Sequence, residues 1–404
     1  MKILWITNIL FPDAANYVGA SVSFGGGWML SAASRIKEYQ AVELAVASVS
    51  HYVTKLTSFE EKGIKYYVLP LTGDNTRYNK SLEELWRVVK KDFNPDVVHI
   101  HGTEYAHGLA YINACGAENV LVSIQGLVSV IARYYKADIN NLDILKSVTF
   151  RDVLRWDSIW QQKHKFKKRG DIETRILQKV SHIIGRTLWD KAHSWAVNPN
   201  ATYHYCEETL RDSFYKNKWH YEKCIPHTIF ISQAGYPIKG LHKVLEAMPL
   251  ILRYYPDTRI YVGGEDIVNK PWYRISGYGR YIRQLIKKLD LSEHIVFLGS
   301  LNESEMCKQY LKSNVFVCPS AIENSPNSLG EAQALGMPYL SAYVGGAPDM
   351  VGQKVETLYR FEEVEMLAFK ICDIFKQKEN VTTINNPQCK CNPVDQILEI
   401  YNTI

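Results

Sequence analysis

Short apolar runs rich in β-branched residues alternate with segments of helical periodicity along the whole chain. In the first half the predicted strands cover residues 2–7, 42–49, 65–69, 96–101, 119–125 and 182–185. Segments of helical character, such as 28–39 and 81–92, separate them. Strands that alternate with helices form a parallel sheet with helices on both faces. The alternation therefore predicts an α/β fold.

The same alternation begins again in the second half, after a polar and aromatic stretch at 215–226 that we interpret as a linker. The predicted strands there cover residues 227–232, 259–263, 294–298, 314–318 and 339–343. The predicted helices cover residues 241–253, 278–289, 304–312, 326–335, 361–376 and 393–401.

The chain is too long for one typical domain, because it has 404 residues. We therefore expect two doubly wound, Rossmann-like domains that face each other across a cleft. The first would cover 1–224 and the second 225–388. The last helix, within 389–404, is short and isolated in the sequence, and we expect it to pack back on the first domain.

The composition argues against several classes of protein. A net charge of +5 is too mild to predict nucleic-acid binding by itself. The eight cysteines have neither zinc-ligand spacing nor the density of a disulfide module, which indicates reduced cysteines in a cytoplasmic protein and no metal site. Residues 1–10 predict a core strand without a signal-peptide cleavage pattern, and no apolar window is long enough for a spanning helix.

The stretch that follows the strand predicted over 314–318 is the most informative about function. Ser325 is the predicted N-cap of a helix and Pro326 its first residue, so Glu331 lies inside the helix and Glu323 in the loop before it. The N–H groups at such a helix start favour a diphosphate. Carboxylates on either side of a phosphate suit the hydroxyl groups of a nucleotide-sugar. An ordinary helix with two solvated acids is the alternative.

A glycine-rich loop follows the first predicted strand and ends in Gly25, Gly26 and Gly27. Glycines let backbone approach a ligand closely, so Gly26 and Gly27 are candidate contacts to a bound donor. Their spacing is not that of a dinucleotide-binding fingerprint.

Residues 150–175 combine basic side chains with aromatic ones such as Trp156, Trp160 and Phe166. Such a segment predicts peripheral contact with an anionic membrane, here the inner face of the cell membrane. The alternative is a solvated helix whose aromatic side chains pack on its own domain, because four acids dilute the positive charge.

Several motifs of the second half occur in a fixed order. They are Lys239-Gly240, Val262-Gly263-Gly264, Phe297-Leu298-Gly299, the stretch from Glu323 to Glu331, Gly336-Met337-Pro338 and Val344-Gly345-Gly346-Ala347-Pro348-Asp349. This order resembles that of the retaining glycosyltransferases of family 4, whose fold is the two-domain GT-B fold. The first half is similar more loosely, through Gly25-Gly26-Gly27 and residues 96–102.

The resemblance implies a role for each matching residue. Glu331 would bind the ribose, Glu323 the donor sugar, and Lys239 the diphosphate, with Gly264 beside the donor. The backbone that would cradle the sugar and phosphates belongs to Asn324, Ser325, Pro326, Asn327 and Ser328. A lysine and a helix N-terminus stabilise the departing nucleotide diphosphate without a metal ion, so no cofactor is expected beyond the donor substrate.

Two features of the family are missing. The arginine that usually precedes the lysine is absent from 232–237, and Arg274 and Arg280 are candidate replacements. The histidine that usually ends the strand predicted over 119–125 is replaced by Gln125, which can hydrogen-bond a sugar hydroxyl but cannot shuttle a proton. Retention by front-face attack, in which the leaving phosphate takes the acceptor's proton, needs no protein nucleophile.

His101 and Glu104, at the end of the strand predicted over 96–101, are the candidate contacts on the acceptor side. Alternation places His99 on the same face as His101, and packed structural histidines are the alternative interpretation.

The expected function is therefore a retaining, metal-independent glycosyltransferase of the hexosyltransferase type. It would move a sugar from a nucleotide-sugar to a glycan or lipid-linked acceptor in cell-surface polysaccharide biosynthesis. Two alternatives remain open: a nucleotide-sugar epimerase of the same fold, and a catalytically silent GT-B protein that binds a nucleotide or glycan. The missing arginine and histidine motivate the silent alternative.

Overall fold

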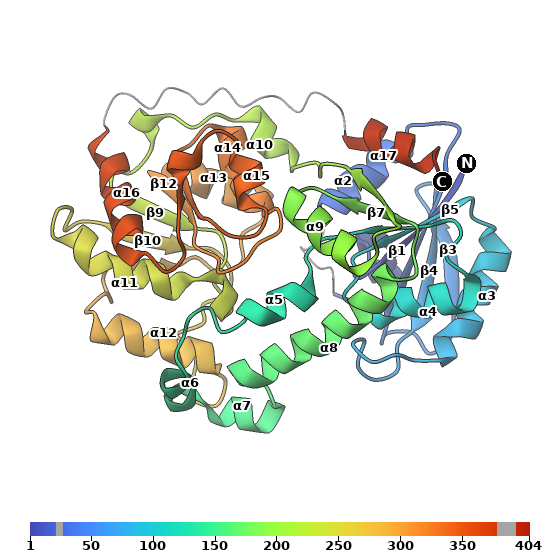
Figure 1. The fold of residues 1–404 in the computed structure, drawn as a ribbon, viewed down its shortest axis with the longest axis horizontal. Helices are drawn as coiled ribbons and strands as arrows, with labels where there is room; N and C mark the ends of the chain where they lie inside the picture. The colour runs from blue at the N-terminus through green and yellow to red at the C-terminus, as the bar shows by residue number, and fades with distance from the viewer. Residues whose placement is uncertain (22–26, 378–392) are drawn as a thin grey trace. The chain divides into compact units, whose positions relative to one another are not determined.

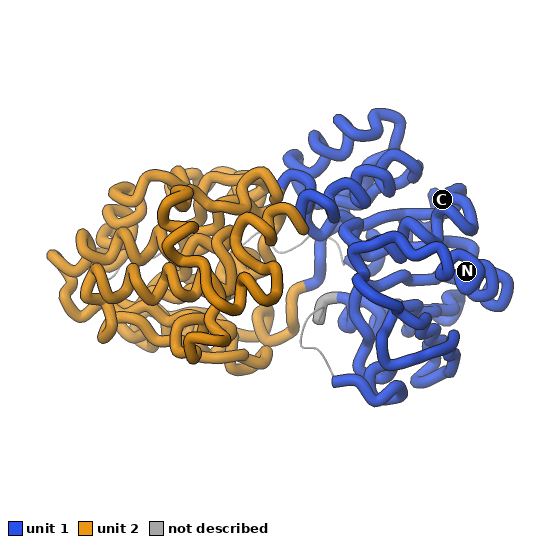
Figure 2. Tube along the Cα trace, turned by 90° about the horizontal axis from the view of Figure 1, so that it is seen from below, with its two compact units in different colours: residues 1–130, 166–209, 389–404 blue, residues 131–165, 210–388 orange. Residues whose placement is uncertain are grey.

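The computed structural model describes residues 1–21, 27–377 and 393–404. It divides into two compact units (Figure 2). Unit 1 contains 1–130, 166–209 and 389–404, and unit 2 contains 131–165 and 210–388. Residues 131–165 and 210–224 thus lie in unit 2, although the sequence analysis placed them in the first domain. The predicted α/β architecture with two largely parallel sheets is confirmed.

The sheet of unit 1 has the strand order β3-β4-β2-β1-β5-β6-β7-β8. Neighbouring strands pair in parallel, except that β3 runs antiparallel to β4. Strands β3 and β8 are absent from the sequence prediction. The strands are β1 (Lys2–Thr7), β2 (Glu43–Ser50), β3 (Thr57–Glu61), β4 (Ile64–Pro70), β5 (Val97–His101), β6 (Val120–Ser123), β7 (His182–Gly185) and β8 (Thr202–Tyr205).

Helices pack on both faces of this sheet (Figure 1). One face packs against α3 (Ser81–Phe93), α4 (Ala106–Cys115) and the end of α8 (Ile159–Leu177). The other packs against α1 (Pro12–Tyr17), α2 (Gly27–Ile36) and α17 (Pro393–Tyr401). Helices α5 (Val128–Tyr134) and α9 (Leu188–Val197) lie in the connections. The hydroxyl of Tyr401 accepts a hydrogen bond from Trp5 Nε1 at 2.9 Å, so α17 belongs to the core of unit 1.

The sheet of unit 2 is parallel, with the order β11-β10-β9-β12-β13-β14. The chain runs outward from β9 through β10 to β11 and then returns to β12 on the other side of β9. The strand order therefore reverses between β9 and β12. The strands are β9 (Thr228–Ile231), β10 (Arg259–Val262), β11 (Ile295–Phe297), β12 (Val315–Cys318), β13 (Tyr339–Ala342) and β14 (Leu358–Tyr359).

Two groups of helices pack on the unit 2 sheet. Helix α11 (Leu241–Leu252) packs against α12 (Gly277–Lys288) and α16 (Val364–Lys376). A second core joins α10 (Asp212–Lys216), α13 (Glu303–Lys312), α14 (Asn327–Leu335) and α15 (Ala347–Val351). Helix α6 (Asn141–Ser147) packs on α12 and is followed by α7 (Phe150–Arg155). Three 3-10 turns are Tyr221–Lys223, Pro237–Lys239 and Val355–Thr357.

The linker predicted at 215–226 is wrong, because this stretch is folded into unit 2. Trp219 is 4% exposed, and its indole Nε1 donates a hydrogen bond to the carbonyl of Ser313 at 2.8 Å. Phe214 just before it is fully buried in the same core. A mixture of polar and aromatic residues thus predicted a linker where a packed segment exists. Within the described ranges, no helix has the length and hydropathy that crossing a bilayer requires.

Candidate functional site

The loops after β9 and β12 lie at the carboxyl edge of the unit 2 sheet, where the strand order reverses. Ligands bind at such switch points in open α/β sheets. Lys239 ends the 3-10 turn after β9, and Glu323 lies in the loop after β12. The structure therefore brings these two predicted residues together on the two sides of the switch point.

Lys239 and Glu323 form an ion pair with 2.6 Å between Nζ and Oε1. The Ser320 hydroxyl donates to the same carboxylate oxygen at 2.7 Å. Both charged side chains are less than one-fifth exposed. Burial alone would lower the pKa of Lys239, but the neighbouring Glu323 carboxylate outweighs it and raises that pKa. The lysine is therefore fully charged at neutral pH.

Two glycines allow neighbouring loops to approach the Glu323 loop closely. Gly345 has φ +54°, and a Cβ built on it would lie 1.8 Å from the carbonyl oxygen of Glu323. Gly240 has φ +70°, and its Cβ would lie 1.7 Å from the carbonyl oxygen of Pro319. The Gly346 N–H donates to the Glu323 carbonyl at 3.1 Å. The loops after β9 and β13 thus fix the loop that carries Glu323.

Glu331 lies on α14 and is 5% exposed. The Arg211 guanidinium donates to its Oε1 from Nε at 3.0 Å and from Nη2 at 2.6 Å. Burial raises the pKa of Glu331, and the charge and hydrogen bonds of Arg211 oppose that rise. The carboxylate predicted to bind ribose is therefore held and neutralised by an arginine of the same unit.

Sequence reasoning missed Arg211, because it lies 120 residues before Glu331 and no motif marks it. The arginines predicted to replace the missing diphosphate contact make other interactions. Arg280 Nη1 donates to the carbonyl of Val148 at 2.9 Å, and the Arg274 guanidinium lies 5.9 Å from the ring centre of Tyr273.

The start of α14 differs slightly from the prediction. The helix begins at Asn327 with Pro326 as its N-cap, and no side chain caps it, so the prediction of Ser325 as N-cap is wrong. Within the described residues, the buried Ser325 hydroxyl has no hydrogen-bond partner. A buried hydroxyl of this kind beside a helix N-terminus is suited to a polar ligand. Residues 324–328 therefore form a polar loop and the first residues of α14, and their contact with a donor stays a prediction.

Gly264 lies at the carboxyl end of β10, the strand next to β9. Its N–H donates to the carbonyl of Gly299 at 2.9 Å, and its φ is +90°. A Cβ built on Gly263 would lie 2.7 Å from the carbonyl oxygen of Ser232, in the loop that leads to Lys239. The predicted donor glycine therefore lies beside the lysine loop.

The remaining predicted residues lie in unit 1. Gln125 is partly buried just after β6, and its role stays a prediction. Gly27 is the first residue of α2, whereas Gly26 lies outside the described residues.

Glu104, after β5, forms part of a buried polar cluster in unit 1. Its Oε1 accepts a hydrogen bond from Asn8 Nδ2 at 3.1 Å. Burial raises the pKa of Glu104, and the charge of Arg169 opposes the rise. In the described part of the chain, Glu104 Oε2 and Asn8 Oδ1 have no hydrogen-bond partner. The role of Glu104 on the acceptor side stays a prediction.

His101 is 1% exposed, with its ring 4.4 Å from that of Trp5 and 3.8 Å from that of His99. Burial lowers the pKa of His101 to about 3, so it is neutral at physiological pH. His99 hydrogen-bonds the hydroxyls of Tyr401 and Ser123. The two histidines are therefore packed in the core, as the alternative interpretation of them expected.

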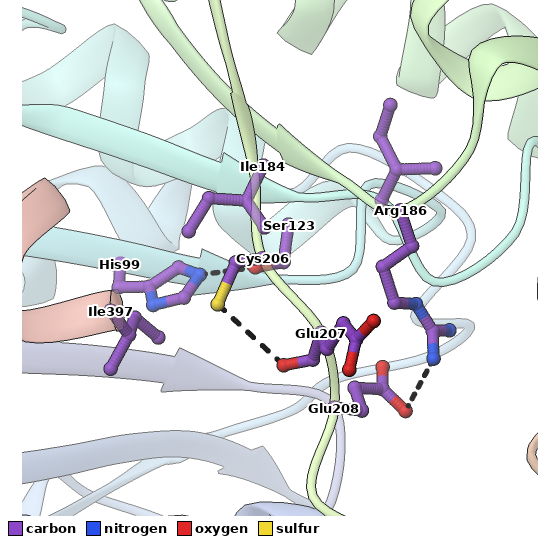
Figure 3. Close-up of a pocket in the computed structure, with 9 residues that line it drawn as sticks. His99, Ser123, Ile184, Arg186, Cys206, Glu207, Glu208 and Ile397 are labelled. Atoms are coloured by element: carbon purple, nitrogen blue, oxygen red, sulfur yellow. Dashed lines mark hydrogen bonds and ion pairs between the residues drawn. The ribbon is translucent and has the colours of Figure 1, made fainter. Parts of the chain in front are cut away.

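A small pocket opens at the carboxyl end of β6 and β7 (Figure 3). It is lined by His99, Ser123, Ile124, Ile184, Arg186, Cys206, Glu207, Glu208 and Ile397. Arg186 and Glu208 form an ion pair across 3.1 Å. The volume is about 40 Å³, which is room for ordered water.

Comparison with known proteins agrees with the geometry of unit 2. The sequence profile of the family described as "Glycosyl transferases group 1" matches residues 222–386. Residues 222–386 belong to the glycosyl transferases group 1 family. This group 1 region contains Lys239, Glu323 and Glu331, together with both glycines that fix the Glu323 loop.

Curated relatives match about a third of the chain. Spore coat protein SA of Bacillus subtilis is 25% identical over 147 residues, which are 35% of this chain and 37% of that protein. A Corynebacterium glutamicum protein named GDP-mannose-dependent monoacylated alpha-(1-6)-phosphatidylinositol monomannoside mannosyltransferase is 26% identical over 141 residues, 33% of each chain. The chain thus aligns with about a third of the length of these relatives.

A solved structure shows the fold over the whole chain. HepE of Anabaena in complex with UDP-glucose has a TM-score of 0.62 and 15% sequence identity, with 100% of this chain and 99% of that chain covered. The group 1 region is therefore part of a GT-B fold.

Proposed function

We propose that this protein is a retaining glycosyltransferase of family 4. It moves a sugar from a nucleotide-diphosphate sugar to a hydroxyl of a glycan or lipid-linked acceptor in cell-surface polysaccharide synthesis. The observation that carries the proposal is the Lys239–Glu323 pair, with 2.6 Å between its atoms, at the switch point of the unit 2 sheet. A cation at such an edge can stabilise the leaving phosphate, and a carboxylate beside it can accept hydrogen bonds from sugar hydroxyls.

Lys239 and the start of α14 supply positive charge for the diphosphate. The departing phosphate gains negative charge in the transition state, and a fixed cation and the positive end of a helix dipole stabilise it. Because these groups provide the charge, the proposed reaction needs no metal ion. The Ser325 hydroxyl, which has no hydrogen-bond partner among the described residues, adds a donor beside the same helix start.

Glu323 and Glu331 hold hydroxyl groups. Glu323 already accepts hydrogen bonds on Oε1 from Lys239 and Ser320, and we assign the donor sugar to this carboxylate. We assign the ribose to Glu331, which Arg211 keeps charged and oriented. Neither acid forms a covalent intermediate. The bond from the anomeric carbon to the phosphate oxygen breaks, the acceptor oxygen bonds to the same face, and the leaving phosphate takes the acceptor's proton.

The names of similar proteins support this substrate class. HepE was solved with UDP-glucose, and the Corynebacterium relative is named as a GDP-mannose-dependent enzyme acting on a phosphatidylinositol mannoside. These names favour a nucleotide-sugar donor, and the second favours a lipid-linked acceptor.

A catalytically silent binding protein is the second candidate, since 232–237 carries no arginine and Gln125 replaces a histidine. Donor hydrolysis distinguishes the two. Each nucleotide-sugar that stabilises the protein in a thermal-shift screen is incubated without acceptor, and the sugar released is followed by NMR.

A transferase releases sugar slowly, and a retaining one releases first the anomer that the donor carries. Release of the opposite anomer would contradict retention. Tight donor binding without turnover, with acceptors present as well, would favour the silent protein.

A further inference from the structure

Helix α7 in unit 2 exposes its apolar side chains and buries a charged one. Its one buried side chain is an acid, Asp152. Its apolar side chains point to solvent, with Phe150, Val153 and Leu154 exposed by 56%, 66% and 72%. Surface helices normally bury their apolar face and expose their charges. The apolar side chains of α7 are therefore exposed instead of packed in the core of unit 2.

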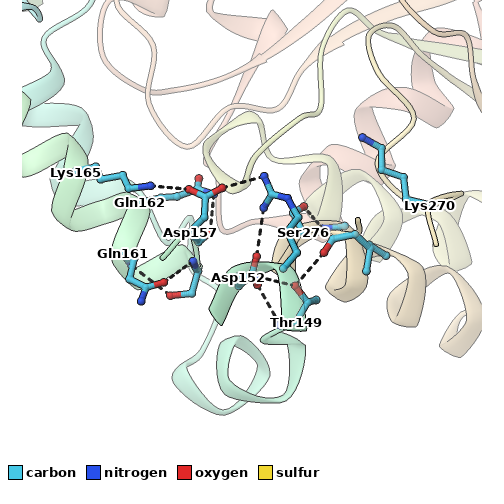
Figure 4. Close-up of polar contacts among 12 residues, drawn as sticks. Thr149, Asp152, Asp157, Gln161, Gln162, Lys165, Lys270 and Ser276 are labelled. Atoms are coloured by element: carbon cyan, nitrogen blue, oxygen red, sulfur yellow. Dashed lines mark hydrogen bonds and ion pairs between the residues drawn. The ribbon is translucent and has the colours of Figure 1, made fainter. Parts of the chain in front are cut away.

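The polar contacts of α7 fix this orientation (Figure 4). Thr149 caps the helix, because its hydroxyl accepts from the N–H of Asp152 at 3.2 Å and its own N–H donates to Asp152 Oδ2 at 3.2 Å. The Thr149 hydroxyl donates in turn to the carbonyl of Ile275 at 2.9 Å. A Cβ built on Gly277 would lie 2.6 Å from Asp152 Oδ2. Asp152 is thus seated against 275–277, which turns Phe150, Val153 and Leu154 outward.

The turn after α7 is also held in place. Trp156 adopts φ +51°, a left-handed conformation that is unfavourable for a non-glycine residue, and it is 71% exposed. Arg151 lies between Asp152 and Asp157, at 3.4 and 3.0 Å, and Lys165 pairs with Asp157 at 3.0 Å (Figure 4). These ion pairs stabilise a turn that presents a tryptophan ring to solvent.

Neighbouring elements of unit 2 extend the exposed apolar area. Helix α6 buries Ile144 and Ser147 and exposes Leu142 and Leu145. The rings of Phe150 and Trp272 are 5.5 Å apart, so residues 272–273 adjoin α7. We call the combined area the α6–α7 surface. Its members are all more than half exposed: Leu142, Leu145, Phe150, Val153, Leu154, Trp156, Trp272 and Tyr273.

Basic side chains accompany the α6–α7 surface. Lys146, Arg155 and Arg274 lie on the same elements and are exposed. Among the acids of these elements, Asp152 is buried and Asp157 pairs with Arg151 and Lys165. Asp143 is partly exposed and accepts a hydrogen bond from Asn140, a neutral side chain. The exposed charges around the apolar side chains are therefore mainly positive.

We infer that the α6–α7 surface docks on an anionic lipid bilayer. Leucine, valine and aromatic side chains enter the boundary between headgroups and acyl chains, and Lys146, Arg155 and Arg274 lie against lipid phosphates. A nucleic acid would match the positive charge but offers no apolar phase for Leu142 and Leu154. A second copy would match the apolar side chains but would bring like charges together in a symmetric interface.

This surface differs from the one expected for residues 150–175. That range is not a single amphipathic helix, because α7 ends at Arg155 and α8 begins at Ile159. Its basic end, 166–175, belongs to unit 1, whereas the α6–α7 surface belongs to unit 2 and includes residues far away in the sequence.

Vesicle cosedimentation tests the inference without any sugar substrate, so its outcome is independent of the transferase proposal. The full chain is mixed with phosphatidylcholine vesicles, either pure or containing about a third phosphatidylglycerol, at low and high salt. We expect binding to the anionic vesicles that salt weakens. Leu154→Gln with Trp156→Gln should reduce the partition coefficient at least about 10-fold, and Arg155→Gln about 5-fold.

The matched control is Tyr254→Gln with Phe369→Gln. These side chains are 76% and 68% exposed in the same unit but lie outside the α6–α7 surface, and this variant should bind like the unchanged protein. All substituted side chains are exposed, so circular dichroism should show unaltered folding. Equal binding to neutral vesicles, or equal loss in the control variant, would overturn the inference. Self-association that Leu154→Gln with Trp156→Gln abolishes, without vesicle binding, would assign the surface to a second copy.

Discussion

The guanidinium of Arg211 donates two hydrogen bonds to a single carboxylate oxygen of Glu331, at 3.0 and 2.6 Å. Glu331 is nearly buried, while the arginine side chain is 27% exposed. A buried carboxylate without a cation would tend to take up a proton. Arg211 therefore keeps Glu331 as a hydrogen-bond acceptor, which is the state that the hydroxyl groups of a ribose require.

Replacing Arg211 by alanine should destabilise unit 2 by about 1–3 kcal/mol, because a buried acceptor is left without its charged partner. Urea unfolding followed by circular dichroism measures the loss. In a double-mutant cycle with Glu331→Gln, the second substitution should recover part of it. Strictly additive effects would show that the two side chains are not coupled.

Gly345→Ala should be far more harmful than Gly352→Ala. Both glycines have positive φ, but a Cβ at Gly352 meets nothing within 4 Å, whereas one at Gly345 would lie 1.8 Å from the Glu323 carbonyl oxygen. Gly352→Ala should therefore cost only the strain of the backbone conformation, about 1–3 kcal/mol, because φ 58° with ψ −119° is a region that L residues rarely adopt. Gly345→Ala should cost several-fold more and displace the Glu323 loop. Equal unfolding midpoints for the two variants would contradict this account of the loop.

Lys239→Ala should lower the rate of donor hydrolysis by about 100-fold or more, because the departing diphosphate loses its cation. Lys243→Ala is the matched control, since Lys243 is also buried but pairs with Asp138 at 2.8 Å and Glu246 at 3.7 Å. The control should keep most of its activity per folded molecule. A comparable loss in both variants would mean that the effect of Lys239 is structural.

His242 predicts a pH dependence of stability. Its Nε2 hydrogen-bonds the carbonyl of Ala137 at 2.8 Å, and burial lowers its pKa from 6.5 to about 4. The unfolded chain therefore binds a proton more readily than the folded one between these values. The stabilisation is present above pH 6.5 and is lost as the pH falls toward 4.

The measurement compares the unchanged protein with His242→Gln at several pH values. The difference between their free energies of unfolding should shrink by about 2 kcal/mol from pH 7 to pH 5. Because both proteins share every other titrating group, the difference isolates His242. Parallel pH profiles would contradict the lowered pKa.

Local patterns predicted much of the fold. The strands 2–7 and 182–185 and the helix 393–401 were predicted with the bounds that the structure has. The strand at 202–205 was missed because its sequence, Thr-Tyr-His-Tyr, is polar, and the one at 57–61 because it ends in two acids. These strands form through pairing with neighbours, which a local pattern does not contain.

Site residues that belong to one motif, such as Glu323 and Glu331, were predicted from the sequence. Residues that reach the site from distant parts of the sequence were missed. Arg211 reaches Glu331 only through the packing of α10 on α14. The outward face of α7 likewise depends on the contact of Thr149 with Ile275, 126 residues away. Such relationships follow from tertiary packing, which neither spacing nor composition encodes.

Titration calorimetry of nucleoside diphosphates with the unchanged protein and with Glu331→Ala tests the central claim most directly. The account predicts that UDP or GDP binds the unchanged protein. Glu331→Ala should weaken that binding by at least about 10-fold, or 1.4 kcal/mol, while circular dichroism shows an intact fold. Equal affinity for the two proteins, or no binding of either diphosphate to the unchanged one, would contradict it.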